Sequence, residues 1–476
     1  MLCDPRRNPR YSASMEKNEE KLFDLLRHEI GSFRDGVRDQ RVTPQIDLAR
    51  LREHLRDHYD FAKPLESEGL FEDVSRWLRE GTVHVTHPRY FGLFNPAVTV
   101  PSIVGDGLAA LYNPQLAAWS HAPFANEMER HVLGVLAERI GFDPSATQAN
   151  FTTGGAEANQ TAVIVAAVRG IPGFETSGVG GADPVIYVSE ESHHSFHKTA
   201  VMCGLGARSI RTIPVDTSFR MDVEALENAV VEDRKSGRLP LFVVGTAGTT
   251  SAGTVDPLSR IATVCEAEGV WFHVDAAWGG SYLLVPELRP VFEGIERADS
   301  VTWDAHKGLS VPMGAGMFFC RHPKAVMNGF GVRTAYMPGN EDDTTDPYSS
   351  TVQWTRRAIG LKVFFSLAAL GVGGYAEMLR RQAAMGGRIR ERLRSDGWTV
   401  INETPLPVVC FTRPSLTNDV GRHTSIAAGI QNRGRVWISH TVLGGRVAVL
   451  RACVTSFETN DDDVDALIEE IAKSAS

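Results

Sequence analysis

Short apolar runs that alternate with helical runs are the feature that most constrains how this chain can fold. Residues 241–245, 269–275 and 298–304 are rich in β-branched and aromatic residues and are bounded by small or polar ones, which is typical of buried strands. Strands that alternate with helices from about residue 99 to residue 365 predict a mostly parallel sheet covered on both faces, and therefore an α/β fold. A chain of 476 residues also exceeds one simple core, so two or more domains are expected.

Asp275 and Lys307 each lie at or just past the end of a predicted strand. Parallel strands bring their carboxyl ends to one edge of the sheet, where α/β proteins bind ligands. A lysine that binds an aldehyde and a carboxylate that keeps a pyridine nitrogen protonated are the two groups that pyridoxal 5′-phosphate requires. Taken singly, Asp275 could cap a helix and Lys307 could be a solvated loop residue, so it is their combination that favours a cofactor site.

A candidate phosphate site precedes the helical run 160–168. Residues 150–159 place Gly154 and Gly155, with neighbouring hydroxyls, where that helix begins. The free amides and positive dipole end of a helix bind a dianion, and glycines let it approach the backbone. The segment is neither a G-x-G-x-x-G nor a Walker loop, and taken alone it is a weak signal.

Three histidines follow the apolar run 184–188, namely His193, His194 and His197. A histidine at a strand end can stack on a flat heterocycle. His193 and His197 have the spacing of a zinc site on a helix, but His194 stands where an H-E-x-x-H motif needs its glutamate, and no third ligand follows nearby. We therefore expect no metal, and structural roles for His194 and His197.

The motifs at residues 153–159, 192–193, 248–251, 273–277, 304–307 and 450–456 together resemble those of the group II pyridoxal-phosphate-dependent amino-acid decarboxylases, a family that includes aromatic-L-amino-acid, glutamate and cysteine-sulfinate decarboxylases. The resemblance runs from about His87 to the C-terminus. It implies a pyridoxal-phosphate-dependent transferase fold of type I in three parts: a helical segment over residues 1–98 that packs on a partner subunit, a large cofactor-binding domain over 99–365, and a small α+β domain over 366–476. It also implies a homodimer whose active site lies at the interface.

The resemblance assigns Lys307 to the cofactor aldehyde, Asp275 to the pyridine nitrogen and His193 to the face of the ring. Relatives often have Asn at the position of Asp304, where it contacts the phosphate, so an anionic residue leaves that contact open. The full set of implied cofactor-binding residues is Gly155, Ala156, His193, Thr249, Asp275, Ala277, Asp304, His306 and Lys307.

On the substrate side, the resemblance places Phe94 and Asn95 in the pocket that holds the amino-acid side chain, together with Trp119. It aligns Arg356 with an arginine that binds a substrate carboxylate. A mobile loop between residues 335 and 353 is expected to carry a catalytic tyrosine, for which Tyr348 is preferred to Tyr336. The aromatic lining predicts an aromatic or bulky apolar amino acid, although Gly308 stands where relatives with aromatic substrates usually have Trp.

The predicted reaction is decarboxylation of an L-amino acid to its amine and carbon dioxide. Orientation decides which bond breaks on this cofactor, so aldehyde synthesis, lyase cleavage and transamination are alternatives. His306 favours a decarboxylase because aminotransferases of this broad fold commonly have Ser before the lysine, and Tyr348 argues against an aldehyde synthase. A non-catalytic scaffold is a further alternative.

Composition excludes other classes of function. The net charge of −9 argues against a nucleic-acid surface, because phosphate binding depends on Lys and Arg. No apolar run approaches the roughly 18 residues that suggest a membrane span. The six scattered cysteines without C-x-x-C spacing and the N-terminus without an apolar segment predict a cytoplasmic protein with reduced thiols.

Overall fold

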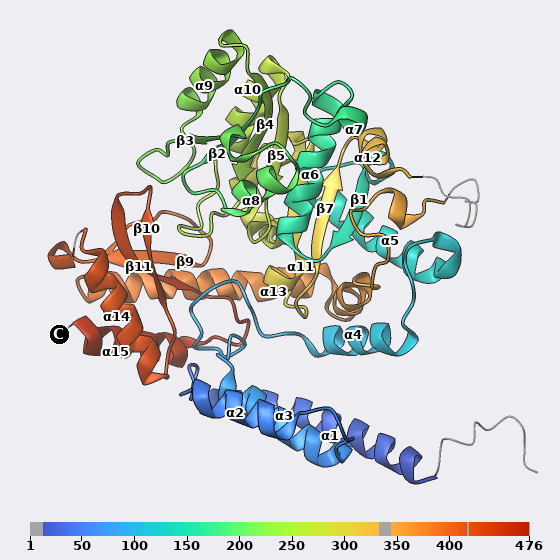
Figure 1. The fold of residues 1–476 in the computed structure, drawn as a ribbon. Coiled ribbons are helices and arrows are strands. Elements are labelled where there is room, and N and C mark those ends of the chain that lie inside the picture. Colours follow the sequence, from blue (N-terminus) through green and yellow to red (C-terminus); the bar gives the residue numbers. More distant parts are fainter. Residues whose placement is uncertain (1–12, 333–343, 417, 476) are drawn as a thin grey trace, which may run out of the picture.

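A seven-stranded sheet forms the centre of the computed structural model, which describes residues 13–332, 344–416 and 418–475 (Figure 1). The five strands β3, β2, β4, β5 and β6 are parallel, while β7 runs antiparallel to both of its neighbours, β6 and β1. This confirms the predicted α/β class. In spatial order the strands are β1 (Gln148–Thr152), β7 (Gly316–Cys320), β6 (Ser300–Asp304), β5 (Trp271–Asp275), β4 (Leu239–Thr246), β2 (Pro184–Ser189) and β3 (Ile210–Ile213).

Helices cover both faces of this sheet because successive strand residues point to opposite sides. On β2, Ile186 and Val188 pack into the core that contains α6, whereas Val185 and Tyr187 pack into the core that contains α5, α9 and α10. The helices up to the end of the sheet are α4 (Val100–Tyr112), α5 (Pro123–Ile140), α6 (Gly155–Gly170), α7 (Phe174–Ser177), α8 (Ser195–Met202), α9 (Val223–Lys235), α10 (Leu258–Glu268), α11 (Ala305–Gly308) and α12 (Pro323–Phe330).

A second, antiparallel sheet lies in the C-terminal part. Its order is β10 (Ser439–Leu443), β11 (Val447–Cys453), β9 (Val408–Thr412) and β8 (Thr399–Val400), and α14 (Val420–Arg433) and α15 (Asp461–Ala475) pack beside it.

The long helix α13 (Gly360–Ser395) connects the two parts (Figure 1). Gly371 breaks it with a φ of 67°. The expected domain boundary at residue 366 falls inside this helix. By length and composition α13 could cross a membrane, which sequence inspection missed, but here it packs against α4, α5 and α15.

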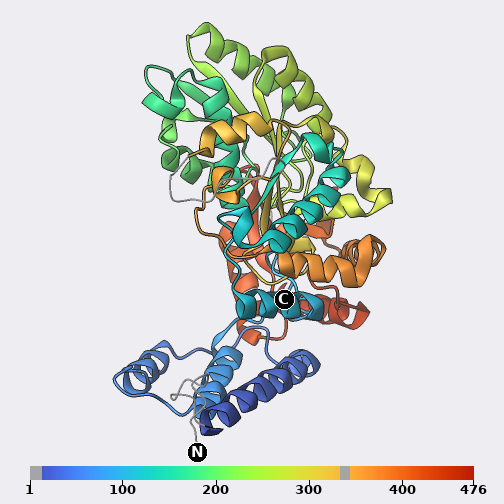
Figure 2. The ribbon, with the colours of Figure 1, turned by 90° about the vertical axis from the view of Figure 1, so that its right-hand side faces the viewer.

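The N-terminal helices α1 (Ala13–Gly36), α2 (Leu48–His58) and α3 (Ser67–Gly81) lie at one end of the molecule, beyond α4 (Figures 1 and 2). A buried carboxylate joins this region to the C-terminal part. Asp463 pairs with Arg38 at 2.9 Å and with Arg89 at 3.0 Å, and its side chain is fully buried. The backbone amides of Asn460 and Asp463 donate reciprocally to the side chains of Asp463 and Asn460, a capping box that starts α15.

We expect Asp463→Ala to lower the free energy of unfolding by about 3 kcal/mol, because it removes one partner of a buried charge cluster and a helix cap. Urea unfolding followed by circular dichroism measures this. Asp461→Ala is the matched control, because Asp461 lies in the same helical turn with its side chain 65% exposed. Equal losses in the two variants would contradict the structural role of Asp463.

Candidate active site

The ends of two neighbouring strands bring Asp275 and Lys307 to the same edge of the sheet. Asp275 is the last residue of β5, and β6 ends at Asp304, directly before the single turn α11 that carries Lys307. The strands are parallel, with Asp275 opposite Thr302. This confirms that both predicted residues lie at a shared carboxyl edge.

Lys307 pairs with Asp304, whose Oδ2 lies 3.0 Å from the lysine Nζ. Asp304 is buried, and its Oδ1 has no hydrogen-bond partner among the described residues. His306 lies beside it, with Nε2 3.7 Å from Asp304 and Nδ1 accepting from the amide of Ala315. Burial lowers the pKa of His306, against the opposing charge of Asp304. The geometry makes Asp304 the counter-ion of Lys307, and a carboxylate there would repel a phosphate rather than bind it.

The Asp275 carboxylate is buried and fully hydrogen-bonded. Asn159 Nδ2 donates to Oδ2 at 3.0 Å, and the amide of Ala277 donates to Oδ1 at 3.0 Å. Within the described ranges, no Lys, Arg or His forms an ion pair with Asp275. Because an uncompensated buried charge is costly, this position suits a cationic group such as a protonated ring nitrogen.

The start of α6 approaches the end of β6 closely. The helix begins at Gly155, at the glycines where the sequence predicted its start. A Cβ on Gly155 would lie 2.9 Å from Asp304 Oδ2 and 3.3 Å from the Cβ of Ala277. Glycine therefore lets the first amides of the helix, which have no intrahelical acceptor, reach the Lys307 side of the sheet edge.

His193 lies between β2 and α8, with part of its ring exposed. Its Nδ1 accepts a hydrogen bond from the amide of Ser195 at 3.2 Å. Partial burial lowers the pKa of its imidazole; the Asp275 carboxylate opposes the shift and the Lys307 ammonium adds to it. Thr249, in contrast, is fully buried with its hydroxyl 3.1 Å from that of Thr254. This contact holds Thr249 within its turn, and its implied role in cofactor binding stays a prediction.

Phe94 lies close to two cations. Its ring stacks on that of Trp278 with centroids 4.5 Å apart, and its centroid is 5.9 Å from Lys307 Nζ and 5.1 Å from the guanidinium carbon of Arg451. The neighbouring Asn95 donates to the sulfur of Met313 at 3.3 Å.

The sequence analysis assigned no function to Arg451, although this residue lies within the motif at residues 450–456. It is buried in β11 and donates to the carbonyls of Gly92 at 2.6 Å and Thr250 at 3.0 Å. Its Nη2 has no partner in the described part of the chain. An arginine inside an apolar strand was the available signal, since charged residues are seldom fully buried without a reason.

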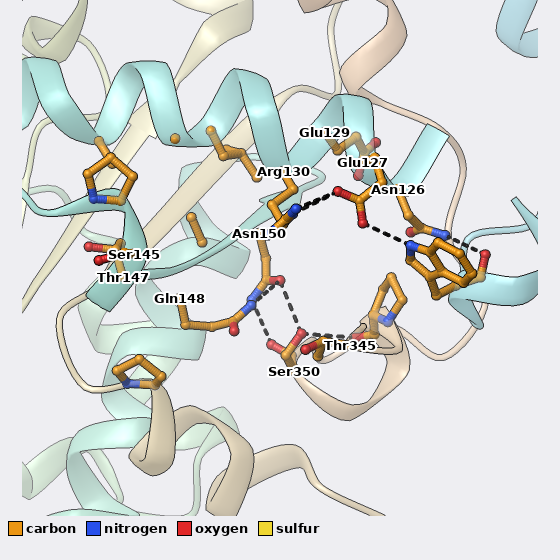
Figure 3. A pocket seen from close by; sticks show the side chains of 18 of the residues that line it. Asn126, Glu127, Glu129, Arg130, Ser145, Thr147, Gln148, Asn150, Thr345 and Ser350 are labelled. Atoms are coloured by element: carbon orange, nitrogen blue, oxygen red, sulfur yellow. Dashed lines mark hydrogen bonds and ion pairs between the residues drawn. The ribbon is translucent and has the colours of Figure 1, made fainter. Parts of the chain in front are cut away.

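Arg356 and Trp119 line a different cavity, of about 320 Å³, which is not lined by Lys307, Asp275 or His193 (Figure 3). Arg356 is buried and pairs with Glu129 at 2.6 Å, so its charge is already neutralised. The indole nitrogen of Trp119 donates to Glu127 at 2.9 Å. In Figure 3, Asn150 and Ser350 point toward each other in the wall, and their hydrogen bonds are 2.7 and 3.1 Å long. These contacts argue against the predicted substrate contacts of Arg356 and Trp119 within one chain.

Tyr348 lies in the short segment Pro347–Ser349, beside this second cavity. Its ring stacks on Trp354 at 4.8 Å and its amide donates to the carbonyl of Ala117. Its part in catalysis stays a prediction. The alternative, Tyr336, falls outside the described residues.

Comparison with known proteins decides the family. Residues 51–413 match the pyridoxal-dependent decarboxylase conserved domain. The chain belongs to this family. The decarboxylase is 30% identical over 435 residues to L-2,4-diaminobutyrate decarboxylase of Rhizobium meliloti (88% of this chain, 86% of the relative) and 28% identical over 418 residues to acidic amino acid decarboxylase GADL1 of Bos taurus (84% and 79%). The crystal structure of Oryza sativa TDC with PLP and tryptamine superposes with a TM-score of 0.89 at 25% identity, covering 98% of this chain and 99% of that one.

The protein is therefore a pyridoxal-phosphate-dependent amino-acid decarboxylase, and its residues fit the cofactor. The buried anion Asp275, without a cation of its own, suits the protonated pyridine nitrogen, and Lys307 suits the aldehyde. The close approach permitted at Gly155 lets the amides of Gly155 and Ala156 serve the phosphate, while His193 and Ala277 are available to the ring faces.

We expect stability to fall as the pH drops from 6.5 toward 4, because the fully buried His273 keeps a pKa of about 4 through the loss of hydration. The unfolded state, in which the pKa is 6.5, then binds more protons than the folded state, and the loss reaches about 3 kcal/mol at most. Chemical unfolding at several pH values measures it. His273→Gln removes this titration, so its stability should depend less on pH across that window; an unchanged slope would rule out His273 as the cause.

Proposed function

We propose that this decarboxylase converts an L-amino acid with an aromatic or bulky apolar side chain into its amine and carbon dioxide. The observation that carries the proposal is the stacked pair Phe94 and Trp278, two buried rings of which Phe94 lies 5.9 Å from Lys307 Nζ. They make the surroundings of the lysine apolar and aromatic, which suits a substrate side chain of the same kind. The solved relative with bound tryptamine supports the same substrate class.

Each residue of the site has a separate function in the proposed reaction. Bound pyridoxal phosphate supplies an electron sink for the pair left when the carboxylate departs. In our proposal Asp275 holds the proton on its ring nitrogen, and Lys307 binds and releases its aldehyde. Asp304 neutralises the Lys307 ammonium at 3.0 Å whenever that amine is free.

His193 is suited to return a proton to the α-carbon of the substrate. Its Nδ1 accepts from the amide of Ser195, so the proton of the neutral ring lies on Nε2, the nitrogen that this contact leaves free. Because its pKa is lowered, the ring is neutral near pH 7 and gives up a proton readily once it is charged. The predicted participation of Tyr348 would add a second donor.

A second substrate class, acidic amino acids, is favoured by Arg451. This buried guanidinium lies 5.1 Å from the ring of Phe94, and its Nη2 is unpartnered within the described residues. A free, buried Arg nitrogen suits a carboxylate, because charge-assisted hydrogen bonds to guanidinium are strong. The acidic amino acid decarboxylase among the relatives agrees with this second reading.

We expect the protein loaded with cofactor to release amine and carbon dioxide in equal amounts from phenylalanine, tyrosine or tryptophan, and more slowly from glutamate or aspartate. A panel of L-amino acids, with amine, carbon dioxide, keto acid and peroxide measured together, tests both the substrate and the reaction. Lys307→Ala is the negative control and should lose turnover. Keto acid or peroxide as the main product would overturn decarboxylation in favour of transamination or aldehyde synthesis.

Arg451→Gln separates the two substrate classes. If Arg451 binds the carboxylate of an acidic side chain, the variant loses activity toward glutamate and aspartate selectively. If it binds the α-carboxylate common to all substrates, KM rises about tenfold or more for each of them. Higher activity on acidic than on aromatic amino acids in the parent protein would contradict the aromatic preference.

We further propose that the protein is a homodimer in which α1 and α3 pack on a second copy. Phe23 is 70% exposed and Leu78 61% exposed, and Leu26, Leu70 and Val74 on the same two helices are exposed as well. Amphipathic helices need a surface that covers their apolar stripe. Light scattering should give twice the mass of the chain, whereas Phe23→Glu combined with Leu78→Glu should favour the monomer; a monomeric parent protein would contradict the proposal.

A further inference from the structure

A buried polar stripe lies on the face of the sheet that α6 covers. The alternation of strand residues directs His273 and Asp275 of β5 to this face, together with Ser300 and Thr302 of β6. All four are buried. They meet Asn159, a buried residue one turn after the start of α6, in an otherwise apolar layer of valine, alanine and phenylalanine side chains.

The Asn159 amide contacts three of these groups. Its Nδ2 donates to Asp275 Oδ2 at 3.0 Å and also lies 3.3 Å from Ser195 Oγ. Its Oδ1 accepts from the hydroxyl of Thr302 at 2.7 Å and lies 3.1 Å from His273 Nε2. Since a carboxylate only accepts and a threonine hydroxyl can donate, the amide is satisfied in this orientation and not in the reverse one.

The hydrogen positions then follow along the stripe. Because Asn159 Oδ1 accepts, His273 carries its proton on Nε2, and its Nδ1 accepts from the hydroxyl of Ser300 at 2.8 Å. The Ser300 oxygen in turn accepts from the indole nitrogen of Trp271 at 2.9 Å. In this series of hydrogen bonds each donor points toward the next residue, and the series ends at Asp275. Buried hydrogen bonds that share one direction strengthen one another.

We propose that Asn159 is a positioning residue for Asp275, and that Thr302 and His273 lock its amide in the orientation that donates to the carboxylate. With the amide reversed, its oxygen would face the carboxylate oxygen, and the Thr302 hydroxyl and His273 Nε2 would both have to change from donor to acceptor. The lock thus directs a hydrogen-bond donor at Asp275 and holds Oδ2 in place, which serves the cofactor nitrogen. The inference rests on the role proposed above for Asp275.

The test compares three variants of the cofactor-loaded protein: Asn159→Ala, Asn159→Asp and Thr302→Val. The readouts are the dissociation constant of pyridoxal phosphate and the visible absorbance of the bound cofactor as a function of pH. We expect Asn159→Ala to weaken cofactor binding about tenfold or more, since a hydrogen bond to a charged group is lost. Thr302→Val should cause a smaller loss in the same direction, because His273 still holds the amide.

Asn159→Asp gives a signature that a merely structural role would not produce. Two carboxylates sharing one site retain a proton with a raised pKa, and the protonated carboxyl group introduced by this substitution can donate to Asp275 again. This variant should therefore show a pH-dependent change in absorbance that the parent and Asn159→Ala lack, with cofactor binding restored at lower pH.

Two reference variants make each outcome decisive. Thr161→Val removes another buried hydroxyl, which donates to the carbonyl of Glu157 in the same helix and to no other described residue. It should leave the absorbance and cofactor affinity unchanged. Asp275→Asn should alter both the absorbance and the cofactor affinity. If it alters neither, the proposed role of Asp275 is wrong, and this inference is wrong with it. If Asp275→Asn alters them while Thr302→Val and both Asn159 variants match the parent, the inference alone is overturned. If the Asn159 variants do not fold, Thr302→Val alone decides the matter. Absorbance and cofactor affinity equal to those of the parent would then overturn the proposed lock.

Discussion

A buried carboxylate that forms no ion pair within the described part of the chain is the constraint on which the active site depends. Asp275 lies at the end of β5 with both oxygens hydrogen-bonded, to Asn159 and to Ala277. Burial of a charge is costly unless it is hydrogen-bonded and paired, and here the protein supplies only the hydrogen bonds. The pairing is left to a positively charged ligand, which is what a protonated pyridine ring provides.

The parallel sheet turns this local arrangement into a site. Because β2, β4, β5 and β6 all run in one direction, the segments that follow them open at one edge, and His193, Asp275 and Lys307 come from three of these segments. The start of α6 reaches the same edge because Gly155 has no side chain. A rigid scaffold thus fixes groups that are far apart in the sequence, which is what orientation of a reacting bond requires.

The ion pairs within the protein determine which charged side chains are left to bind a substrate or a cofactor. Lys307 pairs with Asp304, and Arg356 with Glu129, a residue 227 positions away in the chain. Arg451 is buried, and its Nη2 has no hydrogen-bond partner among the residues that the structure describes. From the sequence, Arg356 was the natural candidate for a substrate carboxylate, since local patterns do not reveal a partner so distant. The same limitation hid the contact of Asn159 with Asp275, a residue 116 positions away in the chain.

The sequence by itself determined the fold class, the strands that carry Asp275 and precede Lys307, the glycine at the helix start and the family, because strand periodicity, turn residues and motif order are local properties. It did not determine that Arg451 lies buried beside Phe94, or which groups hold Asp275. Those features depend on contacts between residues that come together only when helices pack on the sheet. Tertiary packing therefore decided the pairing and orientation of the groups, while the sequence had already specified which groups would be there.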